Sequence, residues 1–279
     1  MSIASEITHK AKSNLAFALK ILPRERREDM VIFYAFCRTI DDLADDPGVA
    51  AEDRARSLDG WKTGITSAFK SADAFQQEVI SLRDRRQIPN ELLVAIIDGC
   101  RMDLQPQRFE TWADVSGYIW KVASAVGLVS IRIFGCQDPA SERYAVALGH
   151  ALQLTNILRD IEEDLSNGGR IYLPLEDLAR FQYTELDLVG RVRDERFLAL
   201  MAYEADRAEK YFNDAAALLP ARDRDALLPA TIMGEIYHVL LDKMRNDHFH
   251  IFKKRYSVSK ARKLAILSKH LIARSCRVE

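Results

Sequence analysis

The sequence predicts an all-α protein, and three observations lead to this class. Helix breakers are rare, since the 279 residues include only 12 Gly and 8 Pro. Apolar residues recur with helical spacing in one segment after another. No alternating pattern typical of a β-strand lasts for more than about four residues. The chain has no linker, repeat or low-complexity tract, so we expect a single domain over residues 1–279.

The expected helices follow one another along the chain. The first is expected over residues 4–21. Pro23 precedes an acid-rich turn and marks the start of the second helix, which should end near Asp46, before Pro47 and Gly48. Clusters of Gly, Pro, Asn and Asp separate the helices that follow. These are expected over 50–70, 72–83, 90–104, 111–134, 139–166, 193–218, 222–246 and 258–274.

Composition and charge exclude several classes of function. The 40 Lys and Arg residues balance 41 Asp and Glu residues, and a net charge of −1 argues against nucleic acid as a partner. No apolar run approaches the roughly 20 residues of a membrane-spanning helix, and the start lacks the layout of a secretory signal. The 4 cysteines form no CxxC pair, which favours reduced, buried thiols. We therefore expect a soluble, cytoplasmic protein.

A cluster of acidic residues lies at the end of the second predicted helix, where aspartates fill most of residues 41–46. The helix dipole disfavours anions at this end, typically by about 0.3–1 kcal/mol each. On a helical projection, two of these aspartates and two preceding residues form one polar stripe within about 60° of arc. This stripe, here called the first ladder, consists of Tyr34, Arg38, Asp41 and Asp45. Apolar neighbours such as Phe33 and Phe36 indicate that it borders a core.

A second ladder is expected on the helix over 139–166. Its members share a face within about 80° of arc, and they are Gln153, Asn156, Asp160 and Asp164. Carboxylates four positions apart on a helix repel each other by a few tenths of a kcal/mol. Both ladders contain such a pair, and a cation between the carboxylates would offset the repulsion. The alternative is a solvated acidic face, but the same spacing on two helices that border apolar residues favours a cation site.

The ligand chemistry of the two ladders indicates which cation they would bind. Their donors are aspartate oxygens and an asparagine carbonyl, without His or Cys, which suits Mg²⁺ and disfavours Zn²⁺. Two facing ladders with Mg²⁺ would form a receptor for diphosphate, whose charge the metal and Arg38 would neutralise. The same metal would assist a diphosphate to leave, in the role of a Lewis acid.

These residues resemble the signatures of the squalene/phytoene synthase family, the head-to-head prenyl diphosphate synthases. Residues 34–45 (YAFCRTIDDLAD) are similar to the family's first aspartate motif. Residues 153–164 (QLTNILRDIEED) and 169–174 (GRIYLP) are similar to the second. Residues 118–127 (YIWKVASAVG) occupy the place of the family's central tyrosine segment, and the resemblance extends from about Lys12 to Lys263.

The resemblance implies the all-α isoprenoid-synthase bundle, with the two ladders facing each other across a central cavity. It also implies a reaction that joins two prenyl diphosphates through their C1 carbons. Mg²⁺ draws diphosphate off the donor, and the double bond of the second molecule attacks the resulting allylic cation and closes a cyclopropane. A rearrangement with loss of the second diphosphate can follow.

The resemblance also assigns roles to residues of this chain. The metal-binding positions are Asp41, Asp45, Asn156, Asp160 and Asp164. The catalytic positions are these four aspartates and Tyr118, which matches a tyrosine that assists proton removal or stabilises the cation. The substrate-binding positions are Asn14, Tyr34, Arg38, Gln153, Asn156, Arg159, Tyr172 and Tyr237. Asn14 stands where the family commonly has serine, and the two arginines can grip phosphate oxygens through paired hydrogen bonds.

The substrate and product are implied by a shorter stretch. Residues 122–127 (VASAVG) with 131–135 (IRIFG) look most like the bacterial branch that makes presqualene diphosphate from farnesyl diphosphate for the hopanoid and squalene route. Phytoene synthase, which uses geranylgeranyl diphosphate, stays open as an alternative. So does an NADPH-dependent squalene synthase, because the absence of a GxGxxG motif decides little. The second motif argues against terpene cyclases and chain-elongating prenyltransferases, and a helical scaffold without enzymatic activity is the remaining alternative.

A dry, apolar cavity is expected, because carbocations react with water. The residues expected to line it are Leu15, Phe17, Leu19, Phe33, Val122, Val126, Ile157 and Leu240. A basic run over 253–255, with further basic residues up to Lys263, is expected to be a solvated face, with a contact for a nucleotide phosphate or for an anionic membrane as the alternatives. Since the substrate and product are hydrophobic, we also expect peripheral contact of the protein with the inner membrane surface.

Overall fold

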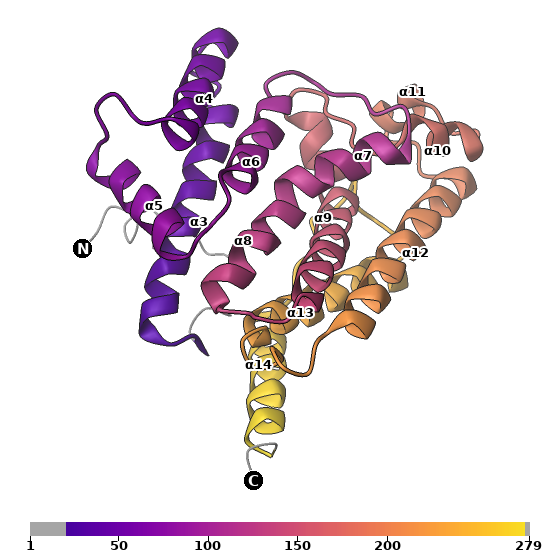
Figure 1. The fold of residues 1–279 in the computed structure, drawn as a ribbon. Coiled ribbons are helices and arrows are strands. Elements are labelled where there is room, and N and C mark those ends of the chain that lie inside the picture. The colour runs from indigo at the N-terminus through magenta and orange to yellow at the C-terminus, as the bar shows by residue number, and fades with distance from the viewer. Residues whose placement is uncertain (1–20, 277–279) are drawn as a thin grey trace.

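The computed structural model describes residues 21–276, and these residues form an all-α bundle without a strand, as the sequence predicts (Figure 1). Its long helices are α3 (Arg24–Asp45), α4 (Ala51–Thr66), α5 (Ala74–Arg85), α6 (Asn90–Met102), α9 (Ala140–Ser166), α12 (Glu195–Leu218), α13 (Leu228–Asn246) and α14 (Lys260–Ser275). A continuous rod consists of α7 (Trp112–Ile119), the π-helical turn η2 (Trp120–Ser124) and α8 (Ala125–Phe134). Two short helices are α10 (Leu175–Arg180) and α11 (Glu185–Val189).

The helices expected from periodicity agree with the structure, with four differences. The helix expected over 4–21 lies outside the described residues. The helix expected over 222–246 begins only at Leu228, because the residues before it form turns. The rod over 111–134 contains a π-helical turn, and the sequence analysis missed α10 and α11. Both are too short to show a helical period of apolar residues.

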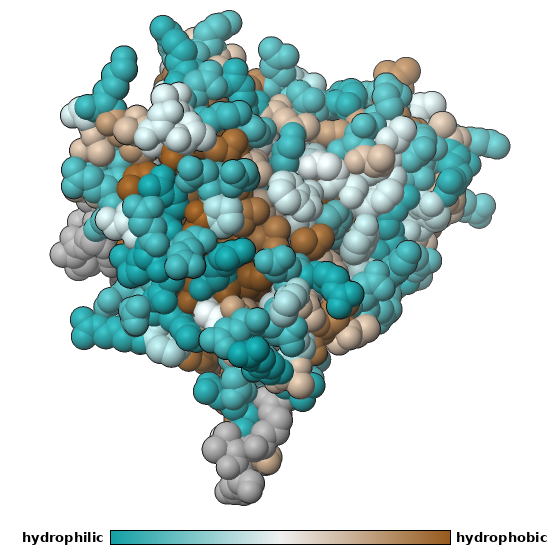
Figure 2. All heavy atoms as spheres, viewed as in Figure 1, coloured by the Kyte–Doolittle hydropathy of each residue, from teal (hydrophilic) through white to brown (hydrophobic). Residues whose placement is uncertain are grey.

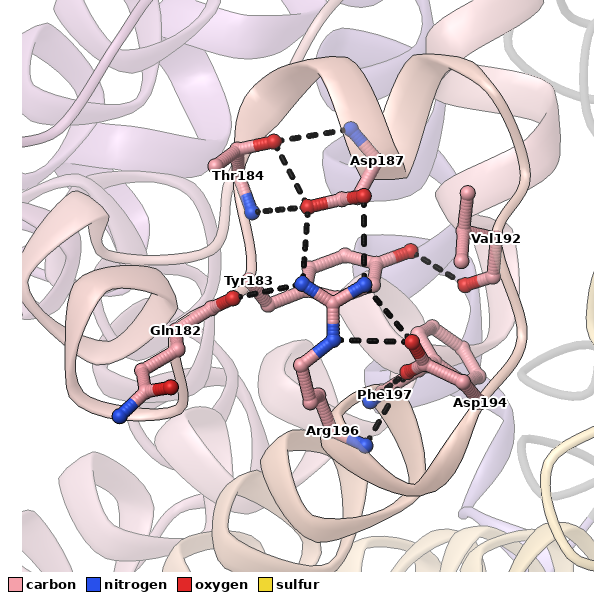
Figure 3. A network of polar contacts seen from close by, with 8 residues as sticks. All are labelled: Gln182, Tyr183, Thr184, Asp187, Val192, Asp194, Arg196 and Phe197. Carbon is pink, nitrogen blue, oxygen red and sulfur yellow. Dashed lines mark hydrogen bonds and ion pairs between the residues drawn. The ribbon is translucent and has the colours of Figure 1, made fainter.

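The segment around α11 is held by side chains that cap helices, as Figure 3 shows. Thr184 and Asp187 form a reciprocal cap at the start of α11. Asp194 caps the start of α12. The Arg196 guanidinium joins these two caps, since it donates to Asp194 over 2.8 Å and to the Asp187 carboxylate over 3.3 Å. These contacts secure the chain between the second aspartate motif and α12.

The rod of α7, η2 and α8 is long and apolar enough to cross a membrane by length and composition, with a mean hydropathy of 1.3 over Trp112–Phe134. This finding corrects the expectation that no segment reaches such a length. In the structure the rod packs against α6 and α9 and lies within the bundle (Figure 1). Its apolar residues are therefore those of a helix that packs in the core of the bundle. Figure 2 shows apolar residues between α6 and α8 on an otherwise mainly hydrophilic face.

The π-helical turn lies where the rod comes closest to α9. Ser124 is fully buried, and its hydroxyl lies 3.0 Å from Nδ1 of His150. A side chain at Gly149 would place Cβ 2.8 Å from the Ser124 Cα, so only glycine permits this approach. An inserted π-turn changes which side chains face a given direction. Within this turn, the consecutive residues Val122 and Ala123 both line the central cavity.

The cysteines differ from expectation at one position. Cys276 is exposed, while Cys37, Cys100 and Cys136 are partly buried. Cys276 lies at the end of α14, which packs on α13 through one side only and therefore leaves its last turn open to solvent. No disulfide links cysteines in the described part of the chain, where all four thiols are free.

Candidate active site

A cavity of about 490 Å³ lies between α3, the η2–α8 rod, α9 and α13. Its size is typical of a small-molecule site. Most of its wall is apolar, and the predicted lining residues Phe33, Val122 and Val126 are part of it. Ile157 and Leu240 are buried outside this lining, because their side chains point into the packed core instead. The other expected lining residues, Leu15, Phe17 and Leu19, lie outside the described residues.

The cavity has a polar end and an apolar end. Side chains of both predicted ladders and of α13 lie at the polar end, and they are Asp41, Gln153, Asn156 and Tyr237. The side chains at the other end are large, and they are Met30, Phe134 and Tyr144. The contact between Gly135 and the Arg26 side chain confirms that the end of α8 lies beside the start of α3. A ligand with a charged head and an apolar tail would fit this polarity.

Two members of the first ladder, Tyr34 and Asp41, line the cavity from α3, whereas the other two, Arg38 and Asp45, are exposed. Arg38 donates to Asp41 over 2.9 Å and pairs with the exposed Asp42 over 2.6 Å. Burial, together with the neighbouring charge of Asp45, raises the pKa of Asp41 to about 6. Tyr34 lines the cavity one to two turns before Asp41. The first ladder therefore places a carboxylate with a raised pKa, Asp41, beside the guanidinium of Arg38.

The second ladder approaches from α9. Asp160 accepts hydrogen bonds from Arg159 over 2.8 Å and from Arg255 over 2.9 Å. Burial opposes its charge, but these two arginines hold the pKa of Asp160 below its ordinary value. Burial and the adjacent charge of Asp160 raise the pKa of Asp164 to about 7. One carboxylate of this ladder is thus paired, and the other lacks a sufficient counter-charge.

Asp103, at the end of α6, connects the two ladders. Its carboxylate accepts hydrogen bonds from Tyr118 over 2.9 Å and from Tyr172 over 2.7 Å. The two tyrosine rings stack with centroids 5.1 Å apart. Arg170 donates to the Asp103 carbonyl over 3.0 Å and to Asp45 over 2.6 Å, so it spans from the second motif to the first. The charge of Asp103 also acts on both Asp41 and Asp164.

Sequence reasoning missed two residues of this site. Asp103 is an isolated aspartate after a helix, and no periodic partner marks it. Arg255 belongs to the basic run that was expected to be a solvated face or a surface contact. In the structure it instead pairs with Asp160 and, over 3.1 Å, with Glu163. Only the basic character of that run, close to a helix with excess acid, could have indicated this contact.

The other predicted site residues fall into three groups, which line the cavity, are buried outside its lining, or lie outside the described residues. Tyr34, Gln153, Asn156 and Tyr237 line the cavity with Asp41. Tyr118 and Tyr172 lie behind the cavity wall and hold Asp103, and burial raises the pKa of Tyr118 well above its ordinary value. A phenol of this kind donates a proton in a hydrogen bond and does not act as an anionic base at neutral pH. Asn14 lies outside the described residues.

The donor set at the polar end fits a hard divalent cation. The Asn156 Oδ1 atom is buried and has no hydrogen-bond partner. Such an orphaned acceptor costs free energy unless a ligand satisfies it. Nearby, Asp41 and Asp164 have raised pKa values, which a cation would lower. All of these donors are oxygens, as Mg²⁺ prefers.

The all-α bundle encloses an apolar cavity whose polar end carries Asp41 of α3 with Gln153 and Asn156 of α9, an arrangement that fits a prenyltransferase-type enzyme of the isoprenoid-synthase class. A family model described as squalene/phytoene synthase matches residues 8–262. The chain belongs to this family, whose members condense prenyl diphosphates head to head.

Known relatives carry two different names. A 15-cis-phytoene synthase of Synechocystis sp. is 34% identical over 279 residues, covering 95% of this chain and 82% of the relative. A presqualene diphosphate synthase of Zymomonas mobilis is 35% identical over 245 residues, covering 86% of this chain and 82% of the relative. The crystal structure of squalene synthase HpnC from Alicyclobacillus acidocaldarius is similar at 26% identity with a TM-score of 0.80, covering 88% of this chain and 93% of that one.

Proposed function

We propose that this enzyme condenses two farnesyl diphosphates head to head to presqualene diphosphate. The observation that carries the proposal is the polarity of the cavity, whose apolar walls end at Asp41 of α3, which pairs with Arg38, and at Gln153 and Asn156 of α9. The 35% identity to a presqualene diphosphate synthase supports this choice of product. The reaction belongs to the farnesyl-diphosphate farnesyltransferase type.

The chain's own residues would act in binding, orientation and exclusion of water. Arg38 and Arg159 would hold diphosphate oxygens, since guanidinium groups bind such oxygens in pairs. Gln153 and Tyr237, which line the cavity beside them, would orient the reacting ends of the substrates. The apolar wall would keep water from the allylic cation. Asp103 would hold Tyr118 in place as a hydrogen-bond donor behind the wall.

The proposed metal ligands are Asp41, Asp45, Asn156, Asp160 and Asp164. Mg²⁺ bound there would supply Lewis-acid neutralisation of the leaving diphosphate. The ion pairs that now occupy these carboxylates would have to open for it, namely Arg38 with Asp41, Arg170 with Asp45, and Arg159 and Arg255 with Asp160. These arginines would then be free to turn toward phosphate oxygens.

A second candidate function is condensation of two geranylgeranyl diphosphates to phytoene. The observation in its favour is the 34% identity to a phytoene synthase over 95% of this chain. The length of chain that the cavity accepts would distinguish the two, and Met30, Phe134 and Tyr144 line its apolar end. A third outcome is squalene, which requires NADPH.

One assay separates these candidates. The purified protein is incubated with farnesyl or geranylgeranyl diphosphate and Mg²⁺, with and without NADPH, and the products are identified by mass. We expect presqualene diphosphate from farnesyl diphosphate, independent of NADPH. Phytoene from geranylgeranyl diphosphate alone would contradict the proposal, and squalene formed only with NADPH would extend it by one step.

Tyr118→Phe is expected to slow turnover or change the product ratio more than it weakens substrate binding. The change removes the hydroxyl that donates to Asp103 but leaves the stacked ring in place. Turnover, product ratio and substrate affinity are measured in parallel. Tyr183→Phe is the matched control, because it removes a buried hydroxyl that donates to the Val192 carbonyl far from the cavity. Wild-type turnover and products in Tyr118→Phe would exclude a role in the reaction.

We further infer a cytoplasmic location with contact to the inner membrane surface. The α14 helix supports this inference, since its outer face combines exposed Leu264 and Ile272 with basic residues and contains no acidic residue. Such a face favours an anionic lipid surface. Fractionation of cells that express the protein tests both parts.

A further inference from the structure

Three side chains with metal-binding atoms meet at the seam between α12 and α13, outside the cavity lining. Nε2 of His238 lies 2.8 Å and 3.1 Å from the two carboxylate oxygens of Glu209. Asp242 follows His238 by four residues on α13, so both lie on one face of the helix. One ligand atom from each of the three lies within 4.8 Å of the others.

The spacing of these atoms is close to that of a bound ion. Ligand atoms around a tetrahedral Zn²⁺ at about 2.0–2.1 Å lie about 3.3 Å from one another. The separations of His238 Nε2 from the Glu209 oxygens, 2.8 Å and 3.1 Å, are close to this value, and the Asp242 oxygen lies within 4.8 Å, so side-chain rotation without movement of the helices would complete the site. The His238 ring packs on Phe212 with centroids 4.9 Å apart, which limits its rotation and keeps Nε2 toward Glu209.

The donor types separate this cluster from the ladders. An imidazole nitrogen with two carboxylates suits Zn²⁺ and similar first-row cations, whereas Mg²⁺ prefers oxygen ligands alone. A second histidine, on α14, provides a contrast. His270 of α14 pairs with Glu235 of α13 over 2.8 Å. The third side chain at this pair is the cation Lys269, which also binds Glu235, whereas the third side chain of the first cluster is the carboxylate Asp242. A cation would be repelled there.

We propose that Glu209, His238 and Asp242 bind a Zn²⁺-class cation that ties α12 to α13. The neighbour of His238 in the chain, Tyr237, lines the cavity, as does Met233 one turn earlier. A cation at the seam therefore restrains the helix that forms one wall of the site. The proposal does not depend on the reaction that the cavity performs.

The test is titration of the purified protein with Co²⁺ and Zn²⁺ in excess Mg²⁺, which occupies the aspartate ladders. Visible absorption of Co²⁺ reports nitrogen and oxygen ligands, and the melting temperature reports stabilisation by Zn²⁺. We expect one equivalent to bind and the melting temperature to rise. His238→Ala should weaken the affinity by about 10–100-fold or more.

Two further variants make the result decisive. Asp242→Asn changes an exposed residue, so it keeps the test valid if His238→Ala does not fold. It should also weaken binding, while His270→Ala should leave it at the wild-type level. Equal affinity in wild type and His238→Ala would overturn the proposal, as would an equal loss in His270→Ala.

Discussion

Asp41→Asn is expected to lower turnover by about 100-fold or more, because loss of a metal ligand removes several kcal/mol of charge stabilisation. Its melting temperature should rise at about pH 8 in the absence of metal. The reason is that burial and Asp45 disfavour the charged Asp41 carboxylate in the folded protein. Asparagine has the same shape and no charge. Turnover and thermal melting are measured on the same preparation.

The pH dependence follows from the sign of the pKa shifts. The pKa of Asp41 is about 6 and that of Asp164 about 7, against an ordinary value of 3.8. Between these limits the folded protein retains protons that the unfolded chain has released, so both groups make stability fall as pH rises. Below the ordinary pKa the effect vanishes, because both states are protonated. The melting temperature of Asp41→Asn should therefore fall less steeply between about pH 4 and 7 than that of the wild type.

Two other substitutions check this interpretation. Asp160→Asn should lower the melting temperature instead, since Arg159 and Arg255 hold the pKa of Asp160 below its ordinary value. Asp46→Asn is the matched control on the exposed end of the same acidic run, where the new side chain can still accept the hydrogen bond from the Gly48 amide. It should retain wild-type turnover. Extensive unfolding of Asp41→Asn would show that Asp41 is structural.

Removal of Mg²⁺ with EDTA is expected to abolish turnover, and added Mg²⁺ to restore it. If the oxygens of both ladders hold the ion, Mg²⁺ should also raise the melting temperature without substrate. The increase should be larger at about pH 8 than at about pH 5, where Asp41 and Asp164 are mostly protonated and compete with the metal.

A double variant, Asp41→Asn with Asp164→Asn, separates the ladders from other sites that bind cations. It should lose the gain in melting temperature that Mg²⁺ produces in the wild type. His238→Ala, at the seam of α12 and α13, should keep that gain. Turnover that persists in EDTA would rule out the metal in the proposed reaction.

Much of the site was predictable, because a helical period places residues three or four apart on one face. The spacing of Asp41 and Asp45, and of Asn156, Asp160 and Asp164, was sufficient to predict two polar stripes beside a core. The structure then places Asp41 and Asn156 on the same cavity. The short helices α10 and α11 were not predictable in this way, since neither is long enough to show a period, and α11 is held by its Thr184–Asp187 cap and by Arg196.

The sequence by itself determined the long helices of the described residues, most of their boundaries within a few residues, and the face of the helix on which each ladder lies. These properties depend on neighbours along the chain. Only the tertiary structure decided which charges meet. Arg170 pairs with Asp45 across 125 residues of sequence, and Arg255 with Asp160 across 95. Asp103 likewise accepts hydrogen bonds from Tyr118 and from Tyr172, the latter across 69 residues of sequence. Contacts at such separations in sequence depend on how whole helices pack against one another. The periodicity of apolar residues along one helix contains no information about that packing.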